Sequence, residues 1–213
     1  MGSDEPTPTA PRSFGKGRLE AFSDGVFAIA ITLLVLDFAI HPPGSPLHQV
    51  LHIWPSFVAY LISFLTIGAA WLGHTALTDR LARTDSVFLR LNLLLLLAVT
   101  FLPFPTGLVG EALREPSSER VFVTLYGCTL LAIRLLGFAL DAYADSEHLY
   151  AAKADDEEQR ERRQLLPVVL AYAIAILIGI AFPVAAVWLY LAIAVYLVVP
   201  FREISTMLRR TAS

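Results

Sequence analysis

Six long apolar segments, separated by polar or proline-rich stretches, organise the chain of 213 residues. A helix needs about 17 to 25 residues to cross a hydrocarbon core of roughly 30 Å. Continuous apolar runs of that length predict membrane-spanning helices rather than the half-polar helices of a soluble domain. The predicted spans cover residues 19–40, 53–77, 87–109, 119–143, 165–182 and 184–201.

Prolines mark the limits and one bend of these segments. The first run stops at the sequence His41-Pro42-Pro43-Gly44, which is a strong breaker. Pro103 and Pro105 lie in the second half of the third run and lack the backbone donor that a straight helix uses, so they predict a bend there. Pro183 alone separates the last two runs, which predicts a tight antiparallel hairpin.

The composition agrees with one integral membrane bundle. Hydrophobic residues make up 56% of the chain and charged residues 16%, against about 25% charged residues in soluble domains. We therefore predict an all-α fold with one transmembrane domain over 16–204, a disordered tail over 1–15 and a C-terminal tail over 205–213. The net charge of −3 and the lack of a strongly basic region argue against a nucleic-acid partner and leave the lipid bilayer as the expected environment.

The distribution of Lys and Arg predicts the orientation of the spans. With six spans, one side receives most of these residues and the other only two, Arg114 and Arg120. The positive-inside rule then places both termini in the cytoplasm. The polar stretch 144–164 lies on that side and is expected to be a solvated helix or helix extension; a regulatory role for it is left open. The residues on the cytoplasmic side are Arg12, Lys16, Arg18, Arg80, Arg83, Arg90, Lys153, Arg160, Arg162, Arg163, Arg202, Arg209 and Arg210.

The first segment combines a polar foot with a narrow apolar stripe. Intramembrane charge is costly and seldom present without a use, so Asp24 near the start of the helix is notable. Ile29, Leu33 and Leu36 recur at i, i+4 and i+7 on one face, with Thr32 at its edge. Spacing alone is most typical of lipid contact or packing, and a lone threonine usually bonds back to its own helix.

A short set of polar residues lies within the apolar segments. The predicted topology brings Ser23 and Asp24 to the depth of His74 and Asn92, where such groups have to satisfy one another. We favour a hydrogen-bonded cluster that holds the first helix, and a proton relay between Asp24 and His74 is the alternative. The other members of this candidate buried set are Arg18, Thr32, Trp71, Arg90 and Arg134.

Motifs of soluble enzymes are missing from the chain. It has no glycine-rich phosphate loop, no HExxH, no GxSxG and no paired cysteines, so we expect no enzyme activity, no metal and no cofactor. His41, His48 and His52 fall in one outer loop and are expected to be solvated. Metal binding or pH sensing by these histidines is left open.

The polar foot also carries a family resemblance. Arg18-x-x-x-Phe22-Ser23-Asp24 resembles the RxxxFSD signature of the transmembrane protein 175 family, which comprises potassium channels of endosomes and lysosomes and their prokaryotic relatives. The match extends to Trp71-x-x-His74, to Arg90-Leu91-Asn92 and to Phe101-Leu102-Pro103-Phe104. A single set of six spans points to the prokaryotic branch, and hence to a multi-pass protein of a bacterial plasma membrane.

The resemblance implies a function that spacing did not show. It implies a homotetramer whose first helices line a pore for potassium ions, closed by apolar rings at Ile29, Leu33 and Leu36, with Thr32 linked to potassium preference. The chain has no TVGYG-like segment, so the implied channel fold lacks a carbonyl-lined filter and is only modestly selective. The alternative function is a proton-coupled secondary transporter. The implied helix-holding network consists of Arg18, Phe22, Ser23, Asp24, Trp71, His74 and Asn92.

Overall fold

The computed structural model describes residues 15–37, 54–112, 119–151 and 156–199, and every named element within them is helical. The predicted C-terminal tail and all but the last residue of the predicted N-terminal tail lie outside these ranges. The all-α prediction is confirmed. The elements are α1 (Lys16–Leu33), η1 (Leu34–Asp37), α3 (Trp54–Arg80), α4 (Ser86–Phe101), α5 (Pro103–Ala112), α6 (Glu119–Ser146), α7 (Asp156–Ala181) and α8 (Pro183–Val198).

Four helical stretches are long and apolar enough to cross a membrane: Lys16–Leu36, Trp54–Arg80, Ser86–Glu111 and Arg120–Ser146. The apolar parts of the last two helices, Leu166–Ala181 and Pro183–Val198, are shorter. At 1.5 Å per residue each of these would reach only about 24 Å. The helix α7 begins at Asp156, within the polar stretch 144–164, so part of that stretch is a helix extension.

The chain bends where its prolines predicted. α4 ends at Phe101 and α5 begins at Pro103, a position that needs no backbone donor because it opens a helix. α7 and α8 are likewise joined through Phe182 alone and pack against each other as a hairpin. The first span differs from its prediction: α-helical geometry ends at Leu33 and tightens into the 3₁₀ turn η1, a common way for a helix to end.

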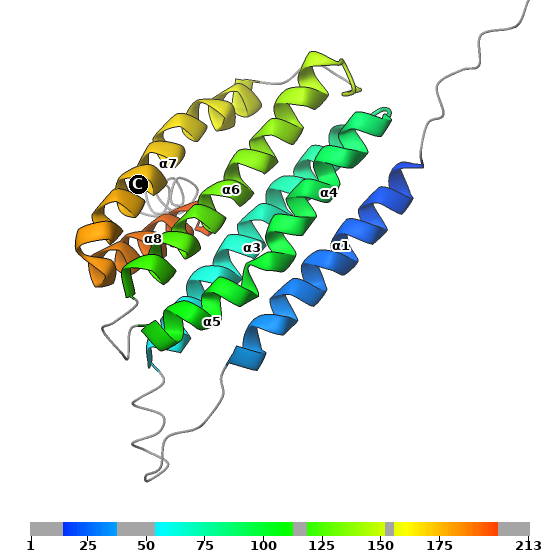
Figure 1. Ribbon diagram of the computed structural model, residues 1–213. Coiled ribbons are helices and arrows are strands. Elements are labelled where there is room, and N and C mark those ends of the chain that lie inside the picture. The colour runs from blue at the N-terminus through cyan, green and yellow to red at the C-terminus, as the bar shows by residue number, and fades with distance from the viewer. Residues whose placement is uncertain (1–14, 38–53, 113–118, 152–155, 200–213) are drawn as a thin grey trace, which may run out of the picture.

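The helix α1 lies at one edge of the bundle, as Figure 1 shows. It packs against α3 and α4, while α6 packs against α4, α5 and α7, and α8 contacts α3 and α7. Because neighbours cover only one side of α1, no described part of the chain covers the other side of this helix. This arrangement decides which of its residues are available to another molecule.

The start of α1, the end of α3 and the end of α6 meet at the same end of the bundle (Figure 1). Lys16 Nζ donates a hydrogen bond of 2.9 Å to the carbonyl of Asp79, which ties α1 to α3. Leu81 and Tyr150 form an isolated antiparallel bridge between the two loops that follow α3 and α6. Lys16, Arg80 and Arg83, three of the basic residues that the positive-inside rule assigned to the cytoplasm, lie at this end.

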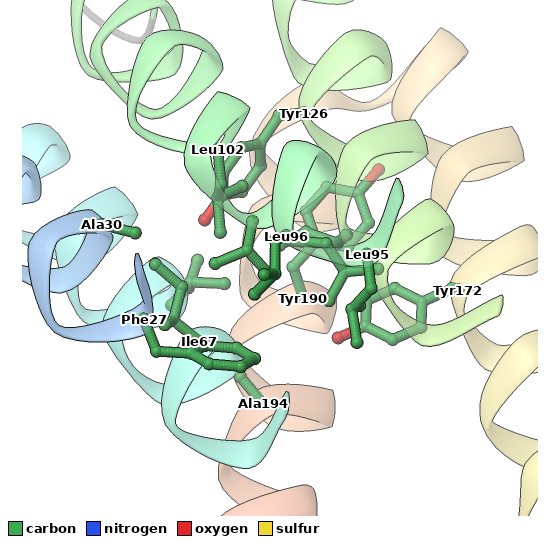
Figure 2. Close-up of a cluster of buried hydrophobic side chains, with 14 of the residues drawn as sticks. Phe27, Ala30, Ile67, Leu95, Leu96, Leu102, Tyr126, Tyr172, Tyr190 and Ala194 are labelled. Atoms are coloured by element: carbon green, nitrogen blue, oxygen red, sulfur yellow. The ribbon is translucent and has the colours of Figure 1, made fainter. Parts of the chain in front are cut away.

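The core combines apolar packing with buried hydroxyl groups, as Figure 2 shows. The ring centroids of Tyr126 and Tyr190 are 5.9 Å apart, and Tyr172 stacks on Tyr190 at 6.3 Å. Ser63 Oγ forms hydrogen bonds of 2.7 Å with Thr106 Oγ1 and 2.8 Å with the Tyr126 hydroxyl. These contacts link α3, α5 and α6 and give the buried hydroxyl groups hydrogen-bond partners.

Candidate functional site

One face of α1 is buried against α3 and α4. Its members recur three or four residues apart, so they form a single stripe along the helix. Four are apolar and one is a serine, which sits in the middle of the buried contact with α4. The stripe consists of Leu19, Ser23, Phe27 and Ala30 on α1 and continues with Leu34 at the start of η1.

The apolar positions singled out in the sequence lie on the opposite, exposed side of α1. Ile29 is 59% exposed, Leu33 40% and Leu36 71% within the single chain. Phe22 is exposed on the same side. These side chains therefore do not pack inside their own subunit, and their partner is either lipid or another molecule.

Thr32 lies on the same exposed side and bonds back to its own helix. Its Oγ1 donates a hydrogen bond of 2.8 Å to the carbonyl of Ile29. The prediction of a back-bonding hydroxyl is confirmed. Because its hydrogen is committed to the backbone, the oxygen keeps its lone pairs for an outside donor or cation.

A chain of hydrogen bonds joins the foot of α1 to α4 and α3. Asn92 Nδ2 donates to Ser23 Oγ at 3.0 Å, and Asn92 Oδ1 lies 2.8 Å from His74 Nε2. An amide oxygen only accepts, so the bond requires the tautomer of His74 that carries hydrogen on Nε2. All three side chains are buried, and the ring of Phe27 lies 5.5 Å from that of His74.

Asp24 takes a different partner from its neighbour in the sequence. Its Oδ1 accepts a hydrogen bond of 2.8 Å from Trp71 Nε1, across the exposed flanks of α1 and α3. Ser23 and Asp24 were both expected to reach His74 and Asn92. Ser23 bonds to Asn92 and is joined to His74 through it, whereas the observed bond of Asp24 goes to Trp71. A direct relay between Asp24 and His74 is not among the hydrogen bonds of the described residues.

Within the described part of the single chain, the buried members of this polar set are Ser23, His74 and Asn92. Arg134 on α6 is half-buried beside α3, and the other members lie on helix faces that no described part of the chain covers. The exposed members are Arg18, Asp24, Thr32, Trp71 and Arg90.

Several structural positions escaped the sequence reasoning. Asp85 caps α4 by accepting from the backbone N–H groups of Val87 at 3.0 Å and Phe88 at 2.8 Å, and it accepts from the Tyr143 hydroxyl at 2.8 Å. The aspartate directly before an apolar run was a signal for this cap. The pairing with Tyr143 joins residues 58 apart in the chain and has no local signal.

No group of three or more His, Cys, Asp or Glu side chains suited to a metal occurs within the described ranges. His41, His48 and His52 lie outside the described residues, so the structure does not bear on their role.

The fold and this first helix define a class: an all-α membrane protein with one helix braced on two neighbours and an uncovered apolar face. Comparison with known proteins agrees. Residues 18–103 match the model of a family described as the endosomal/lysosomal potassium channel TMEM175. The matched stretch contains every residue singled out on α1, α3 and α4.

Two bacterial relatives have a similar sequence over most of their length. A potassium channel of Streptomyces collinus is 40% identical over 69% of this chain and 73% of its own length. A potassium channel of Chamaesiphon minutus is 42% identical over 70% of this chain and 76% of its own. The crystal structure of a lysosomal potassium-selective channel TMEM175 homologue from the same organism superimposes with a TM-score of 0.75, covering 85% of this chain and 95% of that one, at 35% identity.

The chain therefore belongs to the TMEM175 family of potassium channels. Membership of an ion-channel family confirms the expectation that the protein is a membrane channel rather than an enzyme.

Proposed function

We propose that the chain is a potassium-permeable, modestly selective cation channel, in which four copies assemble around an axis and α1 of each copy lines the pore. One observation carries the proposal: the apolar stripe of α1 is exposed while the opposite face of the same helix is held by buried contacts. A helix that lines a pore has to pack against its own subunit on one face and leave the face toward the pore uncovered. The family relationship supports reading the open face as the pore side.

The proposed gate consists of rings of Ile29, Leu33 and Leu36, one residue of each from every subunit. A narrow apolar ring expels water and blocks ions, and a wider one lets hydrated ions pass. The large exposed fractions of these three side chains support their availability to such rings. No carbonyl-lined filter is required.

Thr32 is the proposed source of the potassium preference. Its hydroxyl hydrogen is engaged by the Ile29 carbonyl, which leaves the oxygen lone pairs as the outward-facing polar groups. Four such oxygens around an axis would replace part of the hydration shell of an ion. Because the replacement is partial, we propose modest rather than strict selectivity.

The remaining motif residues are proposed to hold α1 in place rather than to contact ions. The bonds from Ser23 through Asn92 to His74 support this role, as does the bond between Asp24 and Trp71. Arg18 and Phe22 complete the proposed set, although both are exposed in the single chain. The proposed location is a bacterial plasma membrane, with both termini in the cytoplasm.

The alternative, a proton-coupled transporter using Asp24 and His74, receives less support. The observed partner of His74 Nε2 is the amide of Asn92, and an amide side chain does not take up and release a proton as a relay group does. Asp24 is engaged with Trp71 instead.

Potassium flux into liposomes containing the purified protein tests the proposal. We expect the wild-type protein to carry potassium, and the variant Ile29→Asn to carry more current or to lose cation preference, because an amide wets the constriction. Leu177→Asn is the matched control, since Leu177 is equally exposed but lies on α7, away from α1. Identical currents in wild type and Ile29→Asn would contradict the pore assignment.

A further inference from the structure

A cavity of about 170 Å³ lies between α3 and α6, apart from the exposed face of α1. Small residues, four on α3 and one on α6, form part of its wall. A Cβ atom placed on Gly73 or on Gly137 would meet no other atom within 4 Å, so both glycines adjoin open space. A volume this size is about ten times what a single water needs. The small residues lining it are Ala69, Ala70, Gly73, Ala76 and Gly137.

The cavity is also lined by charged side chains. Arg80 and Asp141 lie near the ends of their helices, 3.9 Å apart, and Arg134 lies two turns deeper along α6. The guanidinium of Arg80 stacks 4.1 Å from the ring centroid of Tyr150, whose hydroxyl donates to Asp141. Among the lining residues, two guanidinium groups accompany one carboxylate, so cationic side chains outnumber anionic ones.

Two arginines that line one cavity in a membrane-embedded helix bundle suit an anionic ligand. Ionisable residues within spans are costly and generally mark a functional site. Basic pockets between helices near the cytoplasmic surface are known to bind the phosphate groups of lipids. The cavity begins at the end of the bundle where Arg80 and Asp141 lie, which the Lys and Arg distribution assigns to the cytoplasm.

We propose that this cavity between α3 and α6 binds a single phosphate group, with Arg80 and Arg134 as its cationic contacts. Guanidinium groups recognise phosphate through paired, charge-assisted hydrogen bonds. The phosphate comes from the headgroup of an acidic phospholipid or from soluble phosphate. The small residues of α3 leave room beside it for the ester groups of a lipid.

The site connects to α1 through one side chain. His74 lines the cavity and is also the first member of the hydrogen-bonded chain that runs through Asn92 to Ser23 of α1. An occupant would therefore contact a residue that helps to hold the proposed pore helix. Any effect on potassium flux rests on the proposed function, whereas binding itself does not.

Thermal unfolding of the purified full-length protein in detergent measures binding. Phosphatidylglycerol is titrated against phosphatidylcholine, and inorganic phosphate against chloride at matched ionic strength. We expect phosphatidylglycerol, phosphate or both to raise the unfolding temperature more than the matched control does. A response to the lipid alone assigns the phosphate to a headgroup, and a response to both assigns it to either source. Equal shifts in both comparisons would overturn the proposal.

Two variants locate the binding. Arg134→Gln should weaken it about ten- to a hundredfold, the range expected for a charged hydrogen bond. Arg90→Gln removes an exposed arginine from α4 that does not line the cavity, and should leave binding unchanged. Wild-type binding by Arg134→Gln would overturn the proposal.

Gly137→Leu decides the question if Arg134→Gln does not fold, because the added side chain enters open space and fills the cavity. Gly68→Leu is its control, since a Cβ there also meets nothing within 4 Å and Gly68 does not line the cavity. Binding that survives Gly137→Leu would place the anion elsewhere and refute the site. A protein that binds the anion but carries no potassium would refute the channel and leave the site standing.

Discussion

Replacing Asn92 with leucine removes the middle member of the hydrogen-bonded chain that joins α1 to α3. Asn92 donates to Ser23 at 3.0 Å and is bonded to His74 at 2.8 Å, and all three side chains are buried. Leucine has the same branched arrangement of four side-chain heavy atoms as asparagine, with two bulkier methyl groups in place of the amide oxygen and nitrogen, so the change opens no cavity. The variant therefore removes two hydrogen bonds without deleting side-chain volume.

The expected cost follows from the two groups left without a partner. A buried polar group that loses its hydrogen bond costs about 1 to 3 kcal/mol. Hydrogen bonds between membrane helices average less, about 0.6 kcal/mol, because the unfolded state in a membrane also finds partners. For Ser23 and His74 together we expect a loss of about 2 to 4 kcal/mol of stability, which shifts the unfolding equilibrium toward the unfolded state by a factor of roughly 30 to 1,000.

Denaturant unfolding of the purified protein, followed by tryptophan fluorescence, measures this loss. Thr100→Val is the matched control on the same helix, because the Thr100 hydroxyl is exposed and bonds only to the carbonyls of Leu96 and Leu97 on its own helix. Combining Asn92→Leu with Ser23→Ala should cost less than the sum of the two single changes. A loss for Asn92→Leu no larger than that for Thr100→Val would refute the bracing role of the chain.

Three further changes give distinct outcomes. Asp24→Ala removes the acceptor of the Trp71 indole hydrogen bond. We expect it to reduce tetramer assembly or protein yield, measured by size-exclusion chromatography, more strongly than it reduces single-channel current, measured by bilayer recording. Normal assembly without current would favour an ionic role for Asp24. Burial raises the pKa of Asp85, but hydrogen bonds from the α4 backbone and from the Tyr143 hydroxyl outweigh it, so the pKa is lowered in the folded protein. The stability that Asp85 contributes is therefore fully present above its ordinary pKa of 3.8 and is lost as the pH falls through the folded pKa. Asp85→Ala should therefore lower stability by about 1 kcal/mol at pH 7 and by less in acid, and a pH-independent loss would contradict this. Gly127→Ala places a Cβ 2.1 Å from the hydroxyl of buried Tyr190 and should cost about 1 to 3 kcal/mol in thermal unfolding; an unchanged midpoint would show that the tyrosine shifts freely.

The contacts at the foot of α1 show where sequence reasoning stopped. Ser23 and Asp24 are neighbours in the chain and were expected to share the same partners. A helix turns by about 100° per residue, so adjacent side chains face different neighbours. Ser23 therefore meets α4, and Asp24 meets Trp71 on α3.

The sequence alone does not show which side of each helix is covered by its neighbours, so the burial of single residues could not be predicted from it. Trp71 and Asp24 lie in apolar segments, yet both are exposed, because none of the residues that the structure describes covers that side of α1 and α3. The cavity between α3 and α6 depends in the same way on which small residues face each other across two helices 60 or more positions apart in the sequence.

The sequence by itself determined the number and order of the apolar segments, the bend at Pro103 and the hairpin at Pro183. These features follow from the length of apolar runs and from the missing donor of proline, both of which are local properties. It also carried the motif that places the chain in its family. Only the tertiary structure decided that Ile29 faces outward while Ser23 is buried, and that Arg80 and Arg134 line one cavity. These depend on the rotation and pairing of whole helices, which side-chain packing between distant segments sets.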